Sequence, residues 1–401
     1  MAEQLTRVGR WPVAARVGLI YVAARLVTLG FFALASALST PASRFGVDPG
    51  IGKLLMGWDA QWYWVVAANG YPSPLPLTEA GQVAENAWAF LPLYPWLSQG
   101  VGLFAGGWPV AGPLVALIAG YFAALAFYRL MRQRLDRSTS TWAVVFFVAG
   151  PLAALFQVAY AESLFLLWLI LALDALLRRR YIWLYLLIPL MGFTRPGILA
   201  FALTLGLVGI WRWLRRRADP LPAREIVHLV ALAALATVVG FSWQVIAAVS
   251  TGDPGAYLMT ELAWRRNWIP DAAAHFFPFE GFLAGTAFWA RLWGWPLWVG
   301  FALLAAIVLA VAAVLLFAPA VRRLGVEVRL WSASYLLYLL AVFFPQSSTF
   351  RLLVPLSPLW GAVAVGRHPA WRIGVLVAGL AGQWWWIYNM YALGNTLWQI
   401  P

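Results

Sequence analysis

The stretch WPVAARVGLIYVAARLVTLGFFALASAL, residues 11–38, is apolar over more than the roughly 17–25 residues that a helix needs to cross a bilayer. Its end, Ala35–Ala37, resembles a signal-peptide cleavage site, but the run is too long for a signal-peptide core. We therefore expect an uncleaved membrane anchor. Arg25 is the one basic residue deep inside it, and a charge at that depth needs a partner or water. We expect a structural role for Arg25, paired with an acid that the sequence does not identify.

Similar apolar runs recur along the whole chain. The protein has 401 residues, of which 63% are hydrophobic and only 11% charged, whereas a soluble domain has about 25% charged residues. We predict an all-α polytopic membrane protein, a single integral membrane domain over residues 1–401. Its eleven expected spans are 14–39, 109–130, 141–157, 160–177, 181–193, 197–213, 226–250, 297–318, 330–344, 352–366 and 372–393. Because there is no Cys, disulfides, thiolate nucleophiles and Cys-based zinc sites are excluded.

The net charge of +13 is explained by topology and does not indicate a nucleic-acid partner. With the N-terminus in the cytoplasm, 20 of the 28 Lys and Arg residues fall on the inner side and seven on the outer side, with Arg25 in a span. This asymmetry predicts a multi-pass protein of the cell (plasma) membrane with a cytoplasmic N-terminus and an extracytoplasmic C-terminus.

The long loops of this topology lie on the outer side, at 40–108 and 251–296. The stretch WAFLPLYPWLSQGVGLF, residues 88–104, could pass for a twelfth span. Counting it would place the arginines of 129–137 outside, and two prolines also break it. We therefore expect an interfacial or re-entrant helix there. Since the inner loops are short, any chemistry is expected on the extracytoplasmic face.

The first outer loop contains MGWDAQWYWVVAANGYP, residues 56–72, where Asp59 stands among aromatic residues. An ionised carboxylate against apolar rings costs free energy unless something compensates it. We expect a short helix over 58–69 with Asp59 in its first turn, where the helix dipole favours the anion. Two interpretations stay open, a general base and a helix-capping acid in an aromatic belt. Trp58 and Tyr63 are candidate substrate contacts.

Three further polar residues are expected on the same side. Tyr160 and Glu162 lie in FQVAYAESLFLLW, at the outer end of a span, and both are candidate substrate contacts. For Glu162, two alternatives stay open, a second acid and a cap for the next helix. His275, in the second outer loop, is either a substrate contact or a structural residue.

Two arginines at span mouths suit a lipid-linked phosphate. Arg195 lies in GFTRPG and Arg351 in PQSSTFRLLVP. A guanidinium binds phosphate in a bidentate way, and the alternative is snorkelling to lipid head groups. There is no P-loop, D-x-D or H-E-x-x-H motif, which argues against a nucleotide site, a nucleotide-sugar donor and a zinc protease. We expect no metal and no cofactor.

Four motifs in order resemble a known family. WDAQWYWVVAANGYP (58–72), FLPLYP (90–95), YAESLF (160–165) and TRPG (194–197) are similar to motifs of the PIG-V-like mannosyltransferases, bacterial relatives of GPI mannosyltransferase II. The resemblance covers about the first half of the chain. It implies a GT-C glycosyltransferase fold with a catalytic acid in the first external loop. Family members often have a basic residue before the tryptophan, where this chain has Gly57.

The resemblance implies a polyprenyl-phosphate sugar donor and places the family's tryptophan–aspartate motif on Trp58 and Asp59. The expected function is an inverting transfer of mannose from polyprenyl-phosphate-mannose to a hydroxyl acceptor on a glycolipid, lipoglycan or protein. Asp59 would take the acceptor proton, and Arg195 and Arg351 would hold the departing phosphate.

Two other classes of function remain open from the sequence. A transporter or flippase of lipid-linked sugars would also be polytopic, although transporters usually show related repeats and polar groups near the midplane. A non-catalytic scaffold for envelope assembly would need neither a buried acid nor outer arginines.

Overall fold

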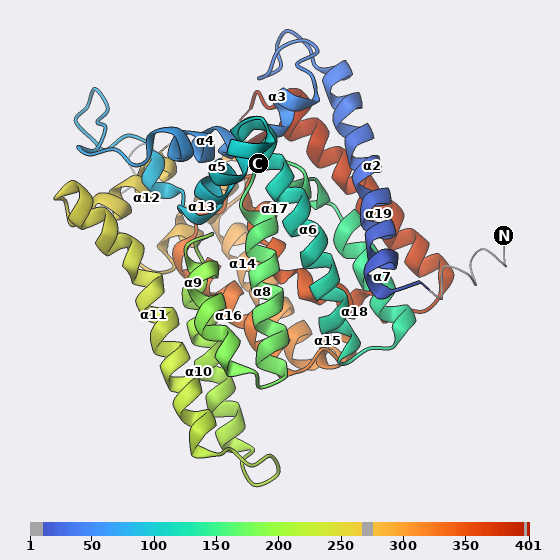
Figure 1. The fold of residues 1–401 in the computed structure, drawn as a ribbon. Coiled ribbons are helices and arrows are strands. Elements are labelled where there is room, and N and C mark those ends of the chain that lie inside the picture. Colours follow the sequence, from blue (N-terminus) through green and yellow to red (C-terminus); the bar gives the residue numbers. More distant parts are fainter. Residues whose placement is uncertain (1–10, 267–275, 397–398) are drawn as a thin grey trace. The chain divides into compact units, whose positions relative to one another are not determined.

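The computed structural model of the chain describes residues 11–266, 276–396 and 399–401 (Figure 1). Within these residues the named elements are all helices, and β-pairing is limited to one isolated bridge between Leu77 and Val83. Four of the described helices are long and apolar enough to cross a membrane, namely α2 (Val13–Leu38), α6 (Trp108–Arg132), α11 (Ala223–Thr251) and α14 (Leu297–Phe317). The predicted all-α class and membrane character are confirmed at this level, whereas the eleven spans stay a prediction.

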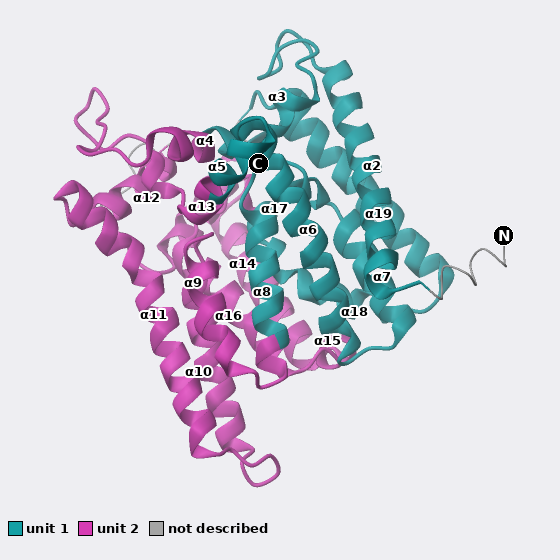
Figure 2. Ribbon diagram, viewed as in Figure 1, with its two compact units in different colours: residues 1–61, 97–174, 350–401 teal, residues 62–96, 175–349 magenta. Residues whose placement is uncertain are grey.

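The chain forms two compact units, each built from separate segments (Figure 2). Unit 1 comprises residues 1–61, 97–174 and 350–401, and unit 2 comprises residues 62–96 and 175–349. Besides α2 and α6, the helices wholly or mostly in unit 1 are α3 (Ile51–Leu55), α5 (Leu93–Ala105), α7 (Arg137–Ala149), η2 (Ala153–Phe156), α8 (Glu162–Leu177), α17 (Thr349–Leu352), η4 (Val354–Leu359), α18 (Trp360–Val363), α19 (Pro369–Ile387) and η5 (Tyr388–Leu393).

Besides α11 and α14, the helices wholly or mostly in unit 2 are α4 (Asp59–Asn69), η1 (Ala87–Ala89), η3 (Tyr181–Trp183), α9 (Leu184–Gly192), α10 (Ile198–Leu214), α12 (Ala256–Arg266), α13 (Glu280–Leu292), α15 (Pro319–Arg322) and α16 (Val326–Val342). Within unit 2, α10 packs against both α11 and α16. In α14 only 11% of the most apolar window is buried, so most of this helix is exposed.

Unit 1 is organised around α7, which contacts α2, α6, α18 and α19. Helices α2 and α6 approach closely because Gly120 leaves room for the Tyr21 hydroxyl, which a Cβ at that position would meet at 2.4 Å. The Tyr21 hydroxyl donates a hydrogen bond of 2.8 Å to the Leu117 carbonyl. A small residue at a helix contact is typical of packing inside membranes.

Arg25 has different partners from the acid that we expected. Its guanidinium donates to the carbonyls of Val148 and Ala153, and the Tyr21 and Phe156 rings each lie 5.3 Å from it. The Val148 carbonyl belongs to the last turn of α7, the negative end of the helix dipole. Arg25 is only 6% exposed, so these carbonyls and rings compensate its charge without a carboxylate among the described residues. The expected acid partner is wrong, and the structural role remains.

Two predicted spans are not continuous helices. The helix expected over 141–157 ends at Ala149, because Gly150 and Pro151 interrupt it before η2. The span expected over 352–366 is instead divided among α17, η4 and α18. Pro355 and Pro358 lie in η4 and lack the N–H groups that a continuous helix needs.

The expected outer loops contain short helices. Residues 40–108 hold α3, α4, η1 and α5, and residues 251–296 hold α12 and α13. Helix α4 matches the helix expected over 58–69 within one residue. Within 88–104, Pro92 precedes α5 and Pro95 lies in its first turn, so the two prolines begin this helix and do not break it.

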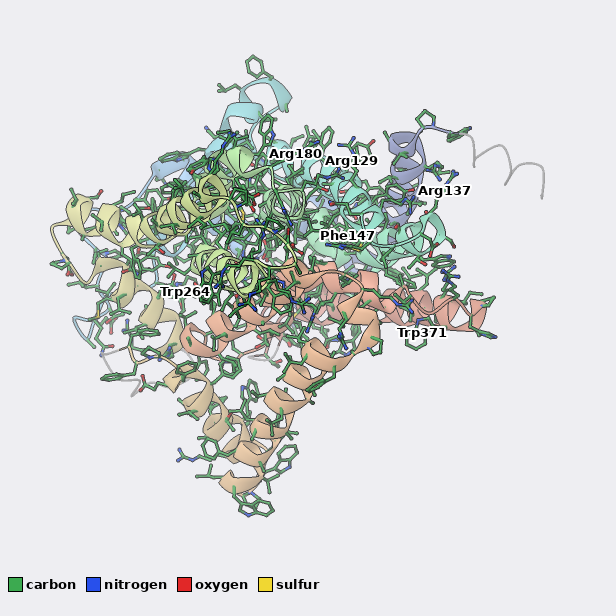
Figure 3. All side chains as sticks on the ribbon, turned by 90° about the horizontal axis from the view of Figure 1, so that it is seen from below. Arg129, Arg137, Phe147, Arg180, Trp264 and Trp371 are labelled. Carbon is green, nitrogen blue, oxygen red and sulfur yellow. The ribbon has the colours of Figure 1, made fainter. Side chains whose placement is uncertain are left out.

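Basic segments expected on the inner side meet within unit 1. Figure 3 labels Arg129, in the last turn of α6, and Arg137, the first residue of α7. Next to Arg137, Asp136 accepts a bond of 3.0 Å from Arg367, and Ser138 accepts one of 3.1 Å from Arg372. These contacts agree with the prediction that residues 129–137 and 367–372 share one side of the membrane.

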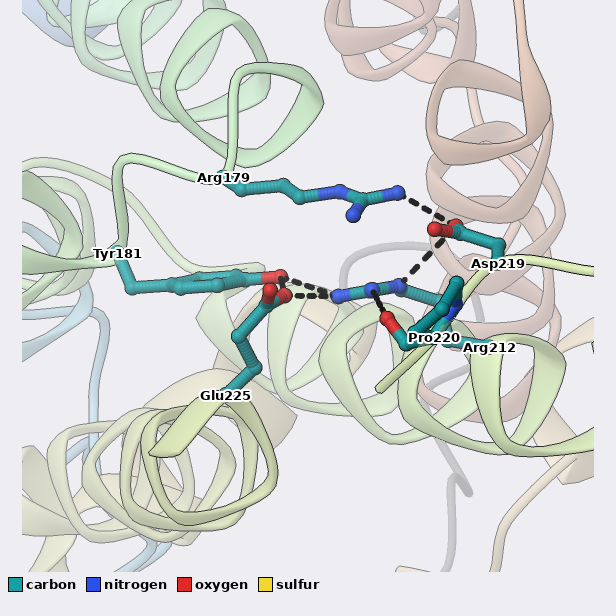
Figure 4. Close-up of polar contacts among 6 residues, drawn as sticks. All are labelled: Arg179, Tyr181, Arg212, Asp219, Pro220 and Glu225. Atoms are coloured by element: carbon teal, nitrogen blue, oxygen red, sulfur yellow. Dashed lines mark hydrogen bonds and ion pairs between the residues drawn. The ribbon is translucent and has the colours of Figure 1, made fainter. Parts of the chain in front are cut away.

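Unit 2 has its own polar network among residues expected to face inward (Figure 4). Arg212 is 5% exposed and donates to Glu225, to the Tyr181 hydroxyl at 3.0 Å and to the Pro220 carbonyl at 3.1 Å. The network ties the ends of α10, η3 and α11 together.

We predict that Arg212→Ala destabilises the protein by about 3 kcal/mol, since removing one partner of a buried ion pair leaves the other uncompensated. Thermal unfolding of the purified protein in detergent measures this loss. Arg179→Ala is the matched control, because Arg179 is 44% exposed in its pair with Asp219, and exposed pairs contribute little. An equal loss in both variants would contradict the prediction.

Candidate functional site

Three charged side chains that the sequence analysis singled out meet within unit 1. The Arg351 guanidinium forms an ion pair with the Asp59 carboxylate, and its Nε lies 3.5 Å from Oε1 of Glu162. The Glu162 side chain is 3% exposed, that of Arg351 12% and that of Asp59 23%. Asp59 is therefore the member of this cluster with the most access to a substrate.

Local helix geometry positions both acids. Asp59 is the first residue of α4 and Glu162 the first residue of α8. At these positions the positive end of each helix dipole favours a carboxylate. Both acids therefore lie in a first helical turn, and this position is compatible with a functional role because each carboxylate also faces Arg351.

The backbone before Asp59 takes a conformation that costs free energy. Trp58 has φ of +57°, in the left-handed region that a bulky residue rarely occupies. The indole is held from several directions: Nε1 donates to the Met390 carbonyl at 2.7 Å, and the Arg44 guanidinium lies 4.3 Å from the ring. The Phe45 ring meets Trp58 edge-on at 6.0 Å. Such strain persists where surrounding contacts fix it, and it is concentrated at functional sites.

Close packing against Phe45 and Leu54 requires a glycine at position 57, directly before Trp58. A Cβ on Gly57 would lie 2.5 Å from the Phe45 ring and 3.2 Å from the Leu54 carbonyl. A basic side chain at this position would therefore displace Phe45. In this chain, the positive charge facing Asp59 comes from Arg351.

Tyr160 lies against the charged cluster. Its ring is fully buried, and the Arg351 guanidinium lies 5.3 Å from its centre. The ordinary pKa of a phenol is about 10, above the physiological range. The phenol therefore stays protonated and can donate a hydrogen bond at any physiological pH.

An apolar cavity of about 490 Å³ begins beside Glu162. Its wall comes from the interrupted segment 150–156, the start of α8, the segment 350–363 and the end of α19. The lining residues that carry a carboxylate or a hydroxyl are Glu162, Ser163 and Ser357. Both serine hydroxyls donate to backbone carbonyls. The cavity is large enough for a small-molecule site, and its chemistry suits a hydrocarbon chain with a polar group at the Glu162 end.

The remaining candidate residues lie outside this cluster. Tyr63 and Arg195 belong to unit 2. Tyr63 is buried edge-on against Phe90 and Tyr94, which makes it a packing residue there. Arg195 is 8% exposed and lies near Tyr338. His275 lies outside the described residues.

Two residues near the cluster were missed by sequence reasoning. Tyr391 is one of 14 tyrosines and lay inside a predicted span, while Arg44 was counted only as an outer charge. The signal that was available is the Tyr388–Gly394 segment, where aromatic and polar residues interrupt an otherwise apolar helix. Among the described residues, no group of three or more His, Cys, Asp or Glu is placed to hold a metal ion.

We expect Gly57→Ala to lower both stability and any activity that depends on Asp59. The added methyl group must displace the Phe45 ring and shift the backbone next to Asp59. Thermal unfolding and substrate binding measure the two effects. The control is Gly52→Ala in α3, where a Cβ meets nothing within 4 Å, so a neutral or slightly stabilising effect is expected there. Equal stability and equal substrate binding in the two variants would show that the backbone at position 57 tolerates the methyl group.

No family model matches the chain, and no curated protein matches it. Its function is therefore inferred from the site residues and from the motifs that resemble those of the PIG-V-like family.

Proposed function

We propose that this protein is an inverting glycosyltransferase that moves mannose from polyprenyl-phosphate-mannose to a hydroxyl acceptor on the extracytoplasmic face of the cell membrane. The observation that carries the proposal is the Asp59–Arg351–Glu162 cluster beside an apolar cavity. One partly exposed acid suits a general base, and the cavity suits the lipid part of the donor. Mannose and the polyprenyl carrier come from the family resemblance.

The ion pair with Asp59 lets Arg351 change its partner as charge moves during the reaction. Before transfer, the guanidinium compensates Asp59. When Asp59 takes the acceptor proton it becomes neutral, so Arg351 can pair with the negative charge that develops on the leaving phosphate. An interaction that strengthens only as charge develops lowers the barrier of the chemical step.

The bonds balance in a single displacement. The acceptor oxygen forms a bond to the anomeric carbon and loses its proton to Asp59. The bond between the anomeric carbon and the phosphate oxygen breaks, and its electron pair leaves with the phosphate. Attack opposite the leaving group inverts the anomeric centre, from β in the donor to α in the product. Phosphate is already a good leaving group, so the step requires no general acid.

Arg351 contacts both Asp59 and Glu162, so it is the cation of this cluster. Arg195, which belongs to unit 2, stays a candidate phosphate ligand from its predicted place at a span mouth.

We expect Asp59→Asn to reduce mannosyl transfer by about 10²- to 10⁴-fold, the usual contribution of a positioned general base. The measurement is transfer of labelled mannose from polyprenyl-phosphate-mannose to a crude lipid acceptor extract, by purified protein in lipid. The matched control is Asp48→Asn, an exposed acid of the same loop that accepts a 2.7 Å hydrogen bond from Ser36. That variant is expected to keep wild-type activity.

Full activity of Asp59→Asn would overturn the assignment of the base. Uptake or scrambling of a lipid-linked sugar that does not depend on Asp59 would instead favour a transporter or flippase.

The cavity generates a separate prediction about donor chain length. Val363→Trp places a large ring in the cavity wall, so the KM for a long-chain polyprenyl donor is expected to rise several-fold while that for a short two-isoprene donor changes little. Val365→Trp, two residues away and not part of the cavity wall, serves as the control. An equal rise for both donors would mean that the cavity does not hold the chain.

A further inference from the structure

The hydroxyls of two buried tyrosines lie next to the charged cluster and interact with each other. Tyr160 and Tyr391 are each fully buried. Both interact electrostatically with Asp59 and Arg351, and Tyr391 also with Glu162. Neither hydroxyl forms a hydrogen bond of ordinary geometry within the described part of the chain, to the other tyrosine or to any other residue. A buried polar group whose hydrogen bonding is incomplete costs free energy, so this pair requires an explanation.

Tyr391 is held in place by contacts that leave its hydroxyl out. Its ring packs edge-on against Phe32 at 5.3 Å and lies 5.5 Å from the Trp386 ring. These contacts fix the ring and would be kept by phenylalanine. Phenylalanine would therefore pack as well as tyrosine at this position, and the hydroxyl makes no contribution to packing.

The backbone around Tyr391 is also unusual. Residues Tyr388–Leu393 form a π-helical turn at the end of α19, and such turns occur frequently at functional sites. Two residues of the segment before α4 bind this turn. Trp58 donates to the Met390 carbonyl, and the Arg44 amide donates to the Leu393 carbonyl at 2.9 Å. The same contacts that fix Trp58 beside Asp59 thus fix Tyr391.

The acceptor oxygens of the cluster indicate which chemical group these hydroxyls suit. The carboxylates of Asp59 and Glu162 both lie against Arg351, close to the two phenols. A neutral hydroxyl can donate to a carboxylate and accept from a phenol at the same time. A sugar ring presents several such hydroxyls.

We propose that Tyr391, together with Tyr160, binds hydroxyl groups of the sugar and so makes this cluster the site that recognises the glycosyl part of the donor. The inference rests on the proposed function; it adds Tyr391 to the candidate substrate contacts and assigns both phenols to the sugar. Both phenols act as donors, and the carboxylates of Asp59 and Glu162 accept from the same ring.

The test compares the affinity of the purified protein for two lipids in the absence of acceptor, polyprenyl-phosphate-mannose and sugar-free polyprenyl phosphate. We expect the wild type to bind the mannosylated lipid more tightly. Tyr391→Phe should reduce this preference by about 2- to 10-fold, the equivalent of one neutral hydrogen bond, and leave the affinity for polyprenyl phosphate unchanged. Tyr160→Phe is expected to act in the same direction.

The matched control is Tyr21→Phe, a buried tyrosine of the same unit whose hydroxyl is already bound to the Leu117 carbonyl. It is expected to lose some thermal stability and to keep the lipid preference. Tyr391→Phe should show the opposite pattern, with little loss of stability, because the hydroxyl that it removes forms no hydrogen bond of ordinary geometry.

The outcomes separate the two proposals. If the wild type binds neither lipid, the proposed function fails and the inference fails with it. If the wild type prefers the mannosylated lipid and Tyr391→Phe keeps the full preference, the function stands and the inference is wrong. A loss of stability in Tyr391→Phe that exceeds the loss in Tyr21→Phe would assign the hydroxyl a structural role and also overturn the inference.

Discussion

The site depends on one guanidinium shared by two carboxylates. Arg351 contacts Asp59 and Glu162, which lie 292 and 189 residues earlier in the chain. In a chain this apolar, three ionised groups close together are affordable only when they compensate one another, because an isolated charge away from water has a large desolvation cost. The interaction therefore joins the first outer loop, the start of α8 and the segment 350–363 into one polar centre.

The rest of unit 1 supplies the surroundings that this centre needs. The interruption at Gly150 and Pro151 shortens α7, and the residues that follow form part of the cavity wall beside Glu162. Arg25 compensates the interruption by binding carbonyls on both of its sides. A buried arginine in a membrane span usually indicates a functional site. Here its contacts are those of a residue that stabilises a break in a helix, and the break makes room for the cavity.

The sequence predicted the members of the site better than their contacts. Asp59, Tyr160, Glu162 and Arg351 stood out because each is polar in apolar surroundings and each falls on the same predicted side of the membrane. Their pairing was not predictable, since Arg351 and Asp59 are joined only by tertiary packing. Hydropathy also could not distinguish a continuous span from the short helices of 350–363, although Pro355 and Pro358 indicated a break. The predicted partner of Arg25 was wrong in type, because every residue has a backbone carbonyl and the sequence does not indicate which of them accept from a side chain.

On the function proposed above, the ion pair also constrains how a substrate must enter the site. A phosphate that displaced Asp59 from Arg351 at the outset would leave the base next to a like charge and would weaken binding of the donor. If the sugar hydroxyls bind first among Asp59, Glu162 and the two phenols, Arg351 keeps its carboxylate partners until the acceptor proton moves. Neutralisation of Asp59 and the departure of the phosphate are then coupled through a single guanidinium. In this arrangement, the same contact keeps the resting site stable and makes a positive charge available at the moment of transfer.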